Sequence, residues 1–271
     1  MKFIYSKEVQ KHKNNFKPIL ALESTILAHG MPYPDNFNFA KKAESMCREN
    51  GVAPATVAII KGVVHIGLEK DELILITKSK EVKKVSQREI GIAITKKWTG
   101  ATTVSATLKI SSLAKIPVFA TGGIGGVHRK VEESFDISED LSALSNSPGI
   151  VVSAGAKAIL DLEKTVEALE SFGVTVLGFK TNEFPAFYSR NSGIKNIISV
   201  QSEEEIVTTF IANKELGVLG SILVVNPIPE EHEIPLEQIR PTINKAMKEA
   251  KRRFISGKKL TPFLLSFLVE K

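Results

Sequence analysis

The stretch IVVSAGAKAILDLEKTVEALESFGVTVLG, residues 150–178, carries the alternation from which the fold class can be read. Its two apolar ends, Ile150–Ser153 and Val174–Gly178, have the composition of buried strands. Between them, Leu160–Phe172 places apolar residues at helical spacing. A strand, a helix and a second strand in this order predict a layered α/β arrangement.

The same alternation continues along the rest of the chain. Further strands are predicted at Ile19–Ile26, Ala55–Ile60, Val63–Ile66, Val118–Thr121, Ile197–Val200 and Ser221–Val225, and further helices at Phe37–Asn50, Arg88–Lys97, Glu203–Lys214 and Leu236–Ile255. Asp35-Asn36 is a candidate cap for the first of these helices and Gly51 a candidate stop, while Pro227-Ile228-Pro229 reads as a loop. Because no low-complexity linker interrupts the pattern, we predict a single domain over residues 1–271: an α/β fold, a three-layer α/β/α sandwich around a mixed, largely parallel sheet.

Composition excludes several classes of protein. With 43% hydrophobic and 24% charged residues, the chain has the usage of a globular protein rather than a disordered or fibrous one. No apolar run has the length of a secretory signal or a membrane span, so we expect a cytoplasmic protein that does not contact a membrane. A single cysteine, Cys47, excludes an internal disulfide and a CxxC zinc pair.

The formal charge of +6 favours an anionic partner, either a phosphorylated metabolite or a nucleic acid. Lysines occur in scattered pairs with few aromatic residues among them, whereas a nucleic-acid groove is expected to interleave rings for stacking. We therefore expect a small-molecule substrate and no nucleic-acid partner.

Residues 21–34, ALESTILAHGMPYP, set the carboxylate of Glu23 inside a predicted apolar strand. Burial there would raise the pKa of the carboxyl group into the range of a general acid. The alternative is a carboxylate that is satisfied by partners or that faces water at the strand end.

The glycine-rich segment TGGIGGVHR, residues 121–129, does not match the dinucleotide motif GxGxxG, because His128 stands where the third glycine is required. Its backbone N–H groups could hold a phosphate, or it could form a tight turn without a ligand. The acidic segment SFDISEDL, residues 134–141, could cap a helix through Ser138 or Asp136. Alternatively, its carboxylates could hold a hydrated Mg²⁺ or Mn²⁺.

Lys157 follows a turn of small residues directly after a predicted buried strand. Desolvation there would lower the pKa of the amine and free it to attack a carbonyl carbon, whereas a lysine at a helix start could also extend into water. Lys84 and the hydroxyl-rich run GATTVSAT, residues 100–107, add a cation and loop amides suited to a phosphate or a sugar.

Eight segments, taken in their order along the chain, resemble the indigoidine synthase A-like family of pseudouridine-5'-phosphate glycosidases. They are ALESTILAHGMPYP, PATVAIIKG, GATTVSAT, FATGGIGGVHR, FDISEDL, SAGAKAILDL, VVNPIP and TPFLL. The resemblance runs from about Pro18 to Leu265. It implies an enzyme that reversibly cleaves the C–C glycosidic bond of pseudouridine 5'-phosphate, giving uracil and ribose 5-phosphate. It also implies a homotrimer and a manganese ion.

The resemblance implies a role for each candidate residue. Lys157 would form an imine (Schiff base) with the opened ribose, Glu23 would be the proton donor, and Asp136 would hold Mn²⁺. Substrate contacts carry over to Lys84, Val104, Ser138, Glu139 and Asp140, with Thr121 and His128 in the same pocket. Family members continue beyond TPFLL with a helical segment that reaches the nucleobase, whereas this sequence stops at Lys271. An aldolase-like phosphosugar lyase and a catalytically silent nucleotide-binding protein stay open as alternatives.

Overall fold

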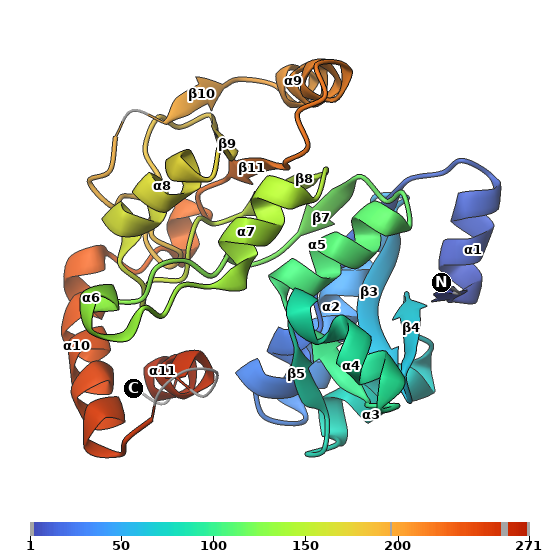
Figure 1. Ribbon diagram of the computed structural model, residues 1–271, viewed down its shortest axis with the longest axis horizontal. Helices are drawn as coiled ribbons and strands as arrows, with labels where there is room; N and C mark the ends of the chain where they lie inside the picture. The colour runs from blue at the N-terminus through green and yellow to red at the C-terminus, as the bar shows by residue number, and fades with distance from the viewer. Residues whose placement is uncertain (1–2, 196, 256–259, 270–271) are drawn as a thin grey trace. The chain divides into compact units, whose positions relative to one another are not determined.

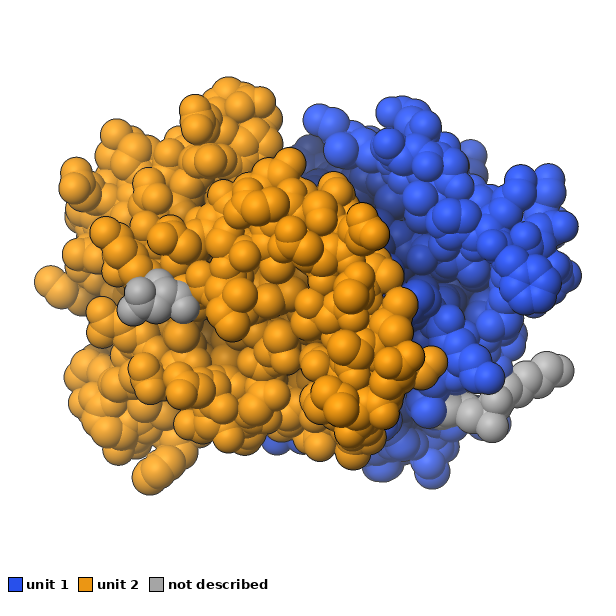
Figure 2. Space-filling view, turned by 90° about the horizontal axis from the view of Figure 1, so that it is seen from above, with its two compact units in different colours: residues 1–120 blue, residues 121–271 orange. Residues whose placement is uncertain are grey.

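The computed structural model describes residues 3–195, 197–255 and 260–269. The chain divides into two compact units, residues 1–120 and 121–271, which Figure 2 shows in separate colours. Each unit contains its own group of strands and its own hydrophobic cluster. The single domain stays a prediction.

In the first unit, the helices α1 to α5 lie around the strands (Figure 1). Its elements in chain order are β1 (Phe3–Tyr5), α1 (Lys7–Asn14), β2 (Ile19–Leu22), the π-helical turn η1 (Ile26–Gly30), α2 (Asp35–Glu49), β3 (Ala53–Ile60), β4 (Val63–Ile66), α3 (Lys70–Lys78), β5 (Lys83–Val85), the 3₁₀ turn η2 (Gln87–Glu89), α4 (Ile90–Thr95), β6 (Gly100–Thr102), α5 (Val104–Leu113) and β7 (Val118–Ala120).

Strand β3 is the centre of the first unit, and all eight of its residues are buried. One edge of β3 pairs with β4 in antiparallel register. Parallel β2 lies beside the first half of β3, from Ala53 to Thr56, and antiparallel β6 lies beside Ala58 and Ile59. The carboxyl ends of β2 and β6 therefore meet beside Val57. Parallel pairs β2–β7, β1–β4 and β5–β6 complete the unit.

The second unit has only parallel pairs between its named strands: β8 with β11, β11 with β9, and β9 with β10. Parallel strands carry their following loops at one edge, so the loops after β8, β9 and β11 lie at the same edge. The elements are α6 (Val131–Ser134), α7 (Glu139–Asn146), β8 (Ile150–Ser153), α8 (Leu162–Ser171), β9 (Thr175–Phe179), β10 (Ile198–Val200), α9 (Glu203–Glu215), β11 (Ile222–Val225), the 3₁₀ turn η3 (Glu230–His232), α10 (Leu236–Arg252) and α11 (Leu260–Val269).

The predicted fold class is confirmed, since helices flank strands whose pairing is mixed but largely parallel. Gly51 ends α2 as predicted, with a φ of +72° that a side chain would disfavour. The predicted cap at Asp35-Asn36 is wrong: the side chain of Asn36 is buried and donates instead to the backbone oxygens of Leu27 and Thr77. This side chain ties η1 to α3.

Two further predictions need correction. The strand predicted at Ile19–Ile26 stops at Leu22, because the hydroxyl-bearing residues that follow turn the chain into η1. The run at residues 100–107 is not a loop, since it forms β6 and the first turn of α5. Within the described residues, no helix is both long and apolar enough to span a membrane, and the cytoplasmic location stays a prediction.

Candidate functional site

The meeting point of β2 and β6 brings two predicted segments of the first unit together. The Oγ of Ser24 and the Oγ1 of Thr102 both donate to the carbonyl oxygen of Val57, at 2.6 and 2.7 Å. The backbone N–H of Thr102 donates in turn to the Oγ of Ser24 at 2.9 Å. These bonds hold the segment of Glu23 against the segment that precedes Val104.

Glu23 lies one residue beyond the end of β2 and is partly buried. It does not lie within a strand, as the sequence had predicted, but at the carboxyl end of one. That edge is where α/β folds place ligand-binding groups. Its action as a proton donor stays a prediction.

Lys84 lies on β5, next to β6, and Val104 lies at the start of α5, directly after β6. Lys84 is the central residue of β5 and pairs with Ala101 of β6. The backbone N–H of Thr103 donates to the carbonyl oxygen of Val85 at 2.9 Å, which fixes the start of α5 beside β5. Val104 is the first residue of α5 and is 1% exposed. Because the first N–H groups of a helix have no partner within it, a valine there can contact an anion through its backbone.

In the second unit, the glycine-rich segment runs between the Lys157 turn, residues 154–157, and the acidic segment. On one side, Ile124 donates its N–H to Gly155 and accepts from the N–H of Lys157, at 3.0 and 3.1 Å. On the other side, Gly126 accepts from the N–H of Ser138 at 2.9 Å. One stretch of backbone therefore positions both predicted arms of the site.

Two glycines of this segment are required by close packing, and none of the four has a positive φ. A Cβ on Gly125 would lie 2.2 Å from the Oγ of Ser138, and one on Gly126 would lie 2.4 Å from the Oγ1 of Thr165. The tight turn and the segment's contact with a phosphate both stay predictions.

Lys157 lies in the turn after β8, five residues before α8 begins, and is partly buried. Ala156 and Ala158 on either side of it are buried. Its Nζ makes no hydrogen bond or ion pair with any residue that the structure describes. An amine without an ionic partner is suited to react as a nucleophile once it has lost its proton.

The acidic segment combines a helix cap with a buried carboxylate. Ser138 caps α7, since its Oγ accepts from the N–H of Asp140 at 3.2 Å, as one sequence interpretation predicted. Asp140, which is 5% exposed, accepts from the N–H of Gly125 at 2.8 Å. Glu139 lies beside it in the same first turn and is partly buried.

Asp136 has the exposure that a metal ligand requires, with 31% of its side chain accessible. Its Oδ2 lies 4.0 Å from the Nε2 of His128, and its backbone oxygen accepts from the N–H of His128. Among the described residues, no group of three His, Cys, Asp or Glu side chains could hold a metal ion. Asp136 therefore fits a cation only as a single carboxylate whose other ligands are water or substrate.

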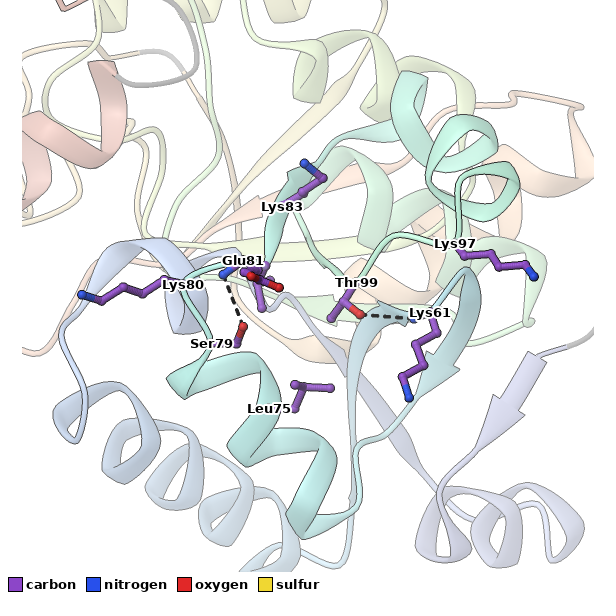
Figure 3. A pocket seen from close by; sticks show the side chains of 9 residues that line it. Lys61, Leu75, Ser79, Lys80, Glu81, Lys83, Lys97 and Thr99 are labelled. Carbon is purple, nitrogen blue, oxygen red and sulfur yellow. Dashed lines mark hydrogen bonds between the residues drawn. The ribbon is translucent and has the colours of Figure 1, made fainter.

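A hollow of about 780 Å³ in the first unit, lined by residues between Lys61 and Thr99, is not this site (Figure 3). Lys80, Lys83 and Lys97 of its lining point in different directions rather than toward one centre. Side chains of successive strand residues alternate between faces, so Lys84 faces away from this hollow. The Nζ of Lys83 instead lies 5.0 Å from the ring centre of Trp98.

Comparison with known proteins assigns the chain to a family. The family model described as indigoidine synthase A like protein matches residues 8–271. The chain belongs to this family. The resemblance seen in the sequence motifs is thereby confirmed.

Curated relatives cover nearly the whole chain. The pseudouridine-5'-phosphate glycosidase of Caldanaerobacter subterraneus subsp. tengcongensis is 52% identical over 260 residues, which are 96% of this chain and 85% of that protein. The enzyme of the same name from Staphylococcus aureus strain MW2 is 48% identical over 98% of this chain and 87% of its own length.

Two solved structures have the same fold. An indigoidine synthase A-like protein from Thermotoga maritima superposes with a TM-score of 0.89 at 36% identity, over 99% of this chain and 86% of its own. A prealnumycin C-glycosynthase in complex with ribulose 5-phosphate also gives 0.89, at 31% identity, over 99% of this chain and 87% of its own.

Reasoning from residue types did not single out Thr25 and His29 in the first unit. Each has a buried polar atom without a hydrogen-bond partner among the described residues. Both belong to the ESTILAH run that follows β2. A lone threonine and a lone histidine form no recognisable motif. The available signal was their spacing of four residues, which places both on one face of a helix.

Proposed function

We propose that this chain reversibly cleaves the C–C glycosidic bond of pseudouridine 5'-phosphate, giving uracil and ribose 5-phosphate. Identity of about half over almost the whole chain with glycosidases of that name supports the substrate. The structural feature that supports the chemistry best is Lys157. Its partly buried amine lies at the carboxyl edge of parallel strands.

A C-glycosidic bond has no exocyclic glycosidic oxygen or nitrogen that an acid could protonate, so the scheme of two carboxylates does not apply. We propose that Glu23 protonates the ribose ring oxygen while the amine of Lys157 adds at C1'. Protonation at C5 of uracil then breaks the C1'–C5 bond and leaves an imine on Lys157. Water hydrolyses the imine, which releases ribose 5-phosphate and returns the free amine.

The other site residues would bind and orient the substrate. In the first unit, Lys84 and the N-terminus of α5 at Val104 provide a cation and free N–H groups for the phosphate. In the second unit, Ser138, Glu139 and Asp140 offer oxygen atoms to the sugar hydroxyls, held in place by the N–H of Gly125.

We propose Mn²⁺ as the cofactor, with Asp136 as its only protein ligand. A bound cation would offset negative charge on the phosphorylated substrate. His128 would orient the carboxylate from the second shell of ligands, given the 4.0 Å between its Nε2 and the Oδ2 of Asp136. Asp136→Ala should weaken the dependence of activity on Mn²⁺ without unfolding the chain, and unchanged activation by the metal would contradict this assignment.

The homotrimer is also a proposal. Apolar side chains on α9 and in the loop after it are exposed, and self-association would bury such a surface: Val207, Ile211, Leu216 and Leu219. Light scattering coupled to size exclusion should give three times the mass of the chain, and a monomer mass would contradict it.

Trapping with borohydride tests the mechanism. Reduction in the presence of ribose 5-phosphate should leave a stable sugar adduct on Lys157, located by mass spectrometry of peptides. Lys157→Arg should form no adduct and lose activity on the order of a thousandfold or more. Lys164→Arg is a matched control, because Lys164 is exposed and paired with Glu132 and Asp161.

An adduct on another lysine, or none, would overturn the imine. Product analysis separates the competing functions: an aldolase-like lyase would release an aldehyde fragment in place of uracil. A silent nucleotide-binding protein would bind the phosphosugar and release nothing.

A further inference from the structure

Four buried polar atoms in the first unit have no hydrogen-bond partner among the described residues: the Oγ1 of Thr25, the Nε2 of His29, the Nδ1 of His65 and the Oε1 of Gln87. The first two lie close together in the sequence. Buried polar atoms are nearly always paired, because leaving one unpaired costs the free energy of its desolvation. Each such atom therefore needs a specific explanation.

The two atoms belong to one structural feature. Thr25 immediately precedes η1 and His29 lies within it, so their spacing of four residues places both side chains on one face of the turn. Short π-helical segments occur frequently at functional sites. The side chain of Asn36, bonded to the carbonyl oxygen of Leu27 at 2.6 Å, fixes η1 in place.

The state of the His29 ring follows from its surroundings. The backbone of Lys83 lies beside the ring, and Nε2 has no hydrogen-bond partner among the described residues. A neutral ring that carries its hydrogen on Nδ1 leaves the lone pair of Nε2 free to accept a hydrogen bond. Burial, followed by the charge of Lys84, lowers the pKa of His29, which favours the neutral ring.

These atoms lie next to the proposed substrate contacts of the same unit. Thr25 is two residues from Glu23, and its neighbour Ser24 donates its N–H to Thr102 at 3.2 Å. The ammonium group of Lys84 is near enough to His29 to influence its charge. Glu23, Thr25, His29 and Lys84 therefore belong to the same part of the first unit.

We propose that Thr25 and His29 together bind one hydroxyl group of the phosphosugar substrate. The hydroxyl donates its hydrogen to Nε2 of His29 and accepts the hydrogen of the Thr25 hydroxyl, which satisfies both buried atoms at once. In the tautomer with its hydrogen on Nδ1, Nε2 cannot donate, so a phosphate oxygen, which only accepts, would not fit. This inference rests on the substrate contact proposed at Lys84.

Binding of four probes tests it: ribose 5-phosphate, its 2-deoxy and 3-deoxy analogues, and inorganic phosphate. Thr25→Val and His29→Leu should each weaken the binding of ribose 5-phosphate about tenfold and leave the affinity for inorganic phosphate unchanged. The wild-type protein should bind one of the two deoxy sugars about tenfold more weakly than ribose 5-phosphate. In both variants that difference should disappear.

Conservative changes give the matched controls. Thr25→Ser and His29→Gln retain a hydroxyl and an acceptor, so affinity for ribose 5-phosphate should recover. His65→Gln alters a buried histidine of the same unit whose Nδ1 lies 2.9 Å from the Oε1 of Glu72 without the alignment of a hydrogen bond, and should leave all four affinities unchanged.

Three results would overturn the inference. Equal weakening for all four probes would indicate general damage or a phosphate contact. Lower thermal stability with unchanged affinities would assign the two atoms to a buried water molecule. Wild-type differences between probes that persist in both variants would place the hydroxyl elsewhere. Failure of the wild-type protein to bind any phosphosugar would instead overturn the proposed function itself.

Discussion

Gly125→Ala should disturb the site through one added methyl group. The Cβ of the alanine would lie 2.2 Å from the Oγ of Ser138, 2.6 Å from the Cβ of Ser138 and 2.8 Å from the Oδ2 of Asp140. The Cβ of Ser138 is fixed by its backbone, so a rotation of the side chain cannot remove the clash. The start of α7 has to move away, and the bond from the N–H of Gly125 to Asp140 lengthens or breaks.

The expected loss of stability is the sum of two terms. Overpacking a buried position costs about 1–3 kcal/mol, and weakening a hydrogen bond to a buried carboxylate costs about 1–2 kcal/mol. We expect a total of about 2–5 kcal/mol, which for a chain of this size lowers the melting temperature by roughly 4–20 °C. The KM for ribose 5-phosphate should rise as well, because Ser138, Glu139 and Asp140 move together.

Thermal unfolding and steady-state kinetics of the purified variant check both effects. Gly91→Ala is the matched control, since a Cβ there meets nothing within 4 Å and Gly91 lies inside α4. Alanine in a helix should leave that variant as stable as the wild-type protein or slightly more so. A Gly125→Ala variant with the melting temperature and KM of the wild-type protein would refute the reasoning.

Two further predictions concern single groups. Thr165→Val keeps the side chain's shape but removes the oxygen that accepts from the N–H of Val127 at 3.0 Å. Unfolding in urea should show that the free energy of unfolding falls by about 1–3 kcal/mol. An unchanged urea midpoint would contradict this prediction. Folding lowers the pKa of His29 from its ordinary value of 6.5. As the pH falls below 6.5, the His29 ring therefore takes up a proton more readily in the unfolded chain than in the folded one, and the folded state loses stability. Replacing His29 with Gln should reduce the loss of stability between about pH 7 and about pH 5, and equal slopes for both proteins would contradict this.

The strands that the sequence predicts best are apolar runs with clear ends. Val63–Ile66 and Ile150–Ser153 were predicted with their observed bounds, as β4 and β8. β5 and β6 were missed because their residues, Lys-Lys-Val and Gly-Ala-Thr, do not form the apolar run that marks the equally short β7 and β10. α5 was missed because most of its residues are buried, so that it has no polar face to set the helical period.

The candidate site was predictable where residue type alone is unusual. A lysine among small residues and a cluster of acids identified Lys157 and the acidic segment without coordinates. Val104 could come only from the family resemblance, because its side chain carries no polar atom and its backbone N–H matters only at the start of a helix. Thr25 and His29 needed coordinates, since their importance depends on the absence of partners.

The glycine-rich segment gives the second unit a single cooperative element. Its two edges are bonded to the Lys157 turn and to the acidic segment, so local unfolding that frees one edge removes the support of the other. The amides of Lys157 and Ser138 should therefore exchange their hydrogens for deuterium at closely similar rates. Loss of the amine that we propose forms the imine and loss of the carboxylates that we propose bind the sugar would then be one event rather than two.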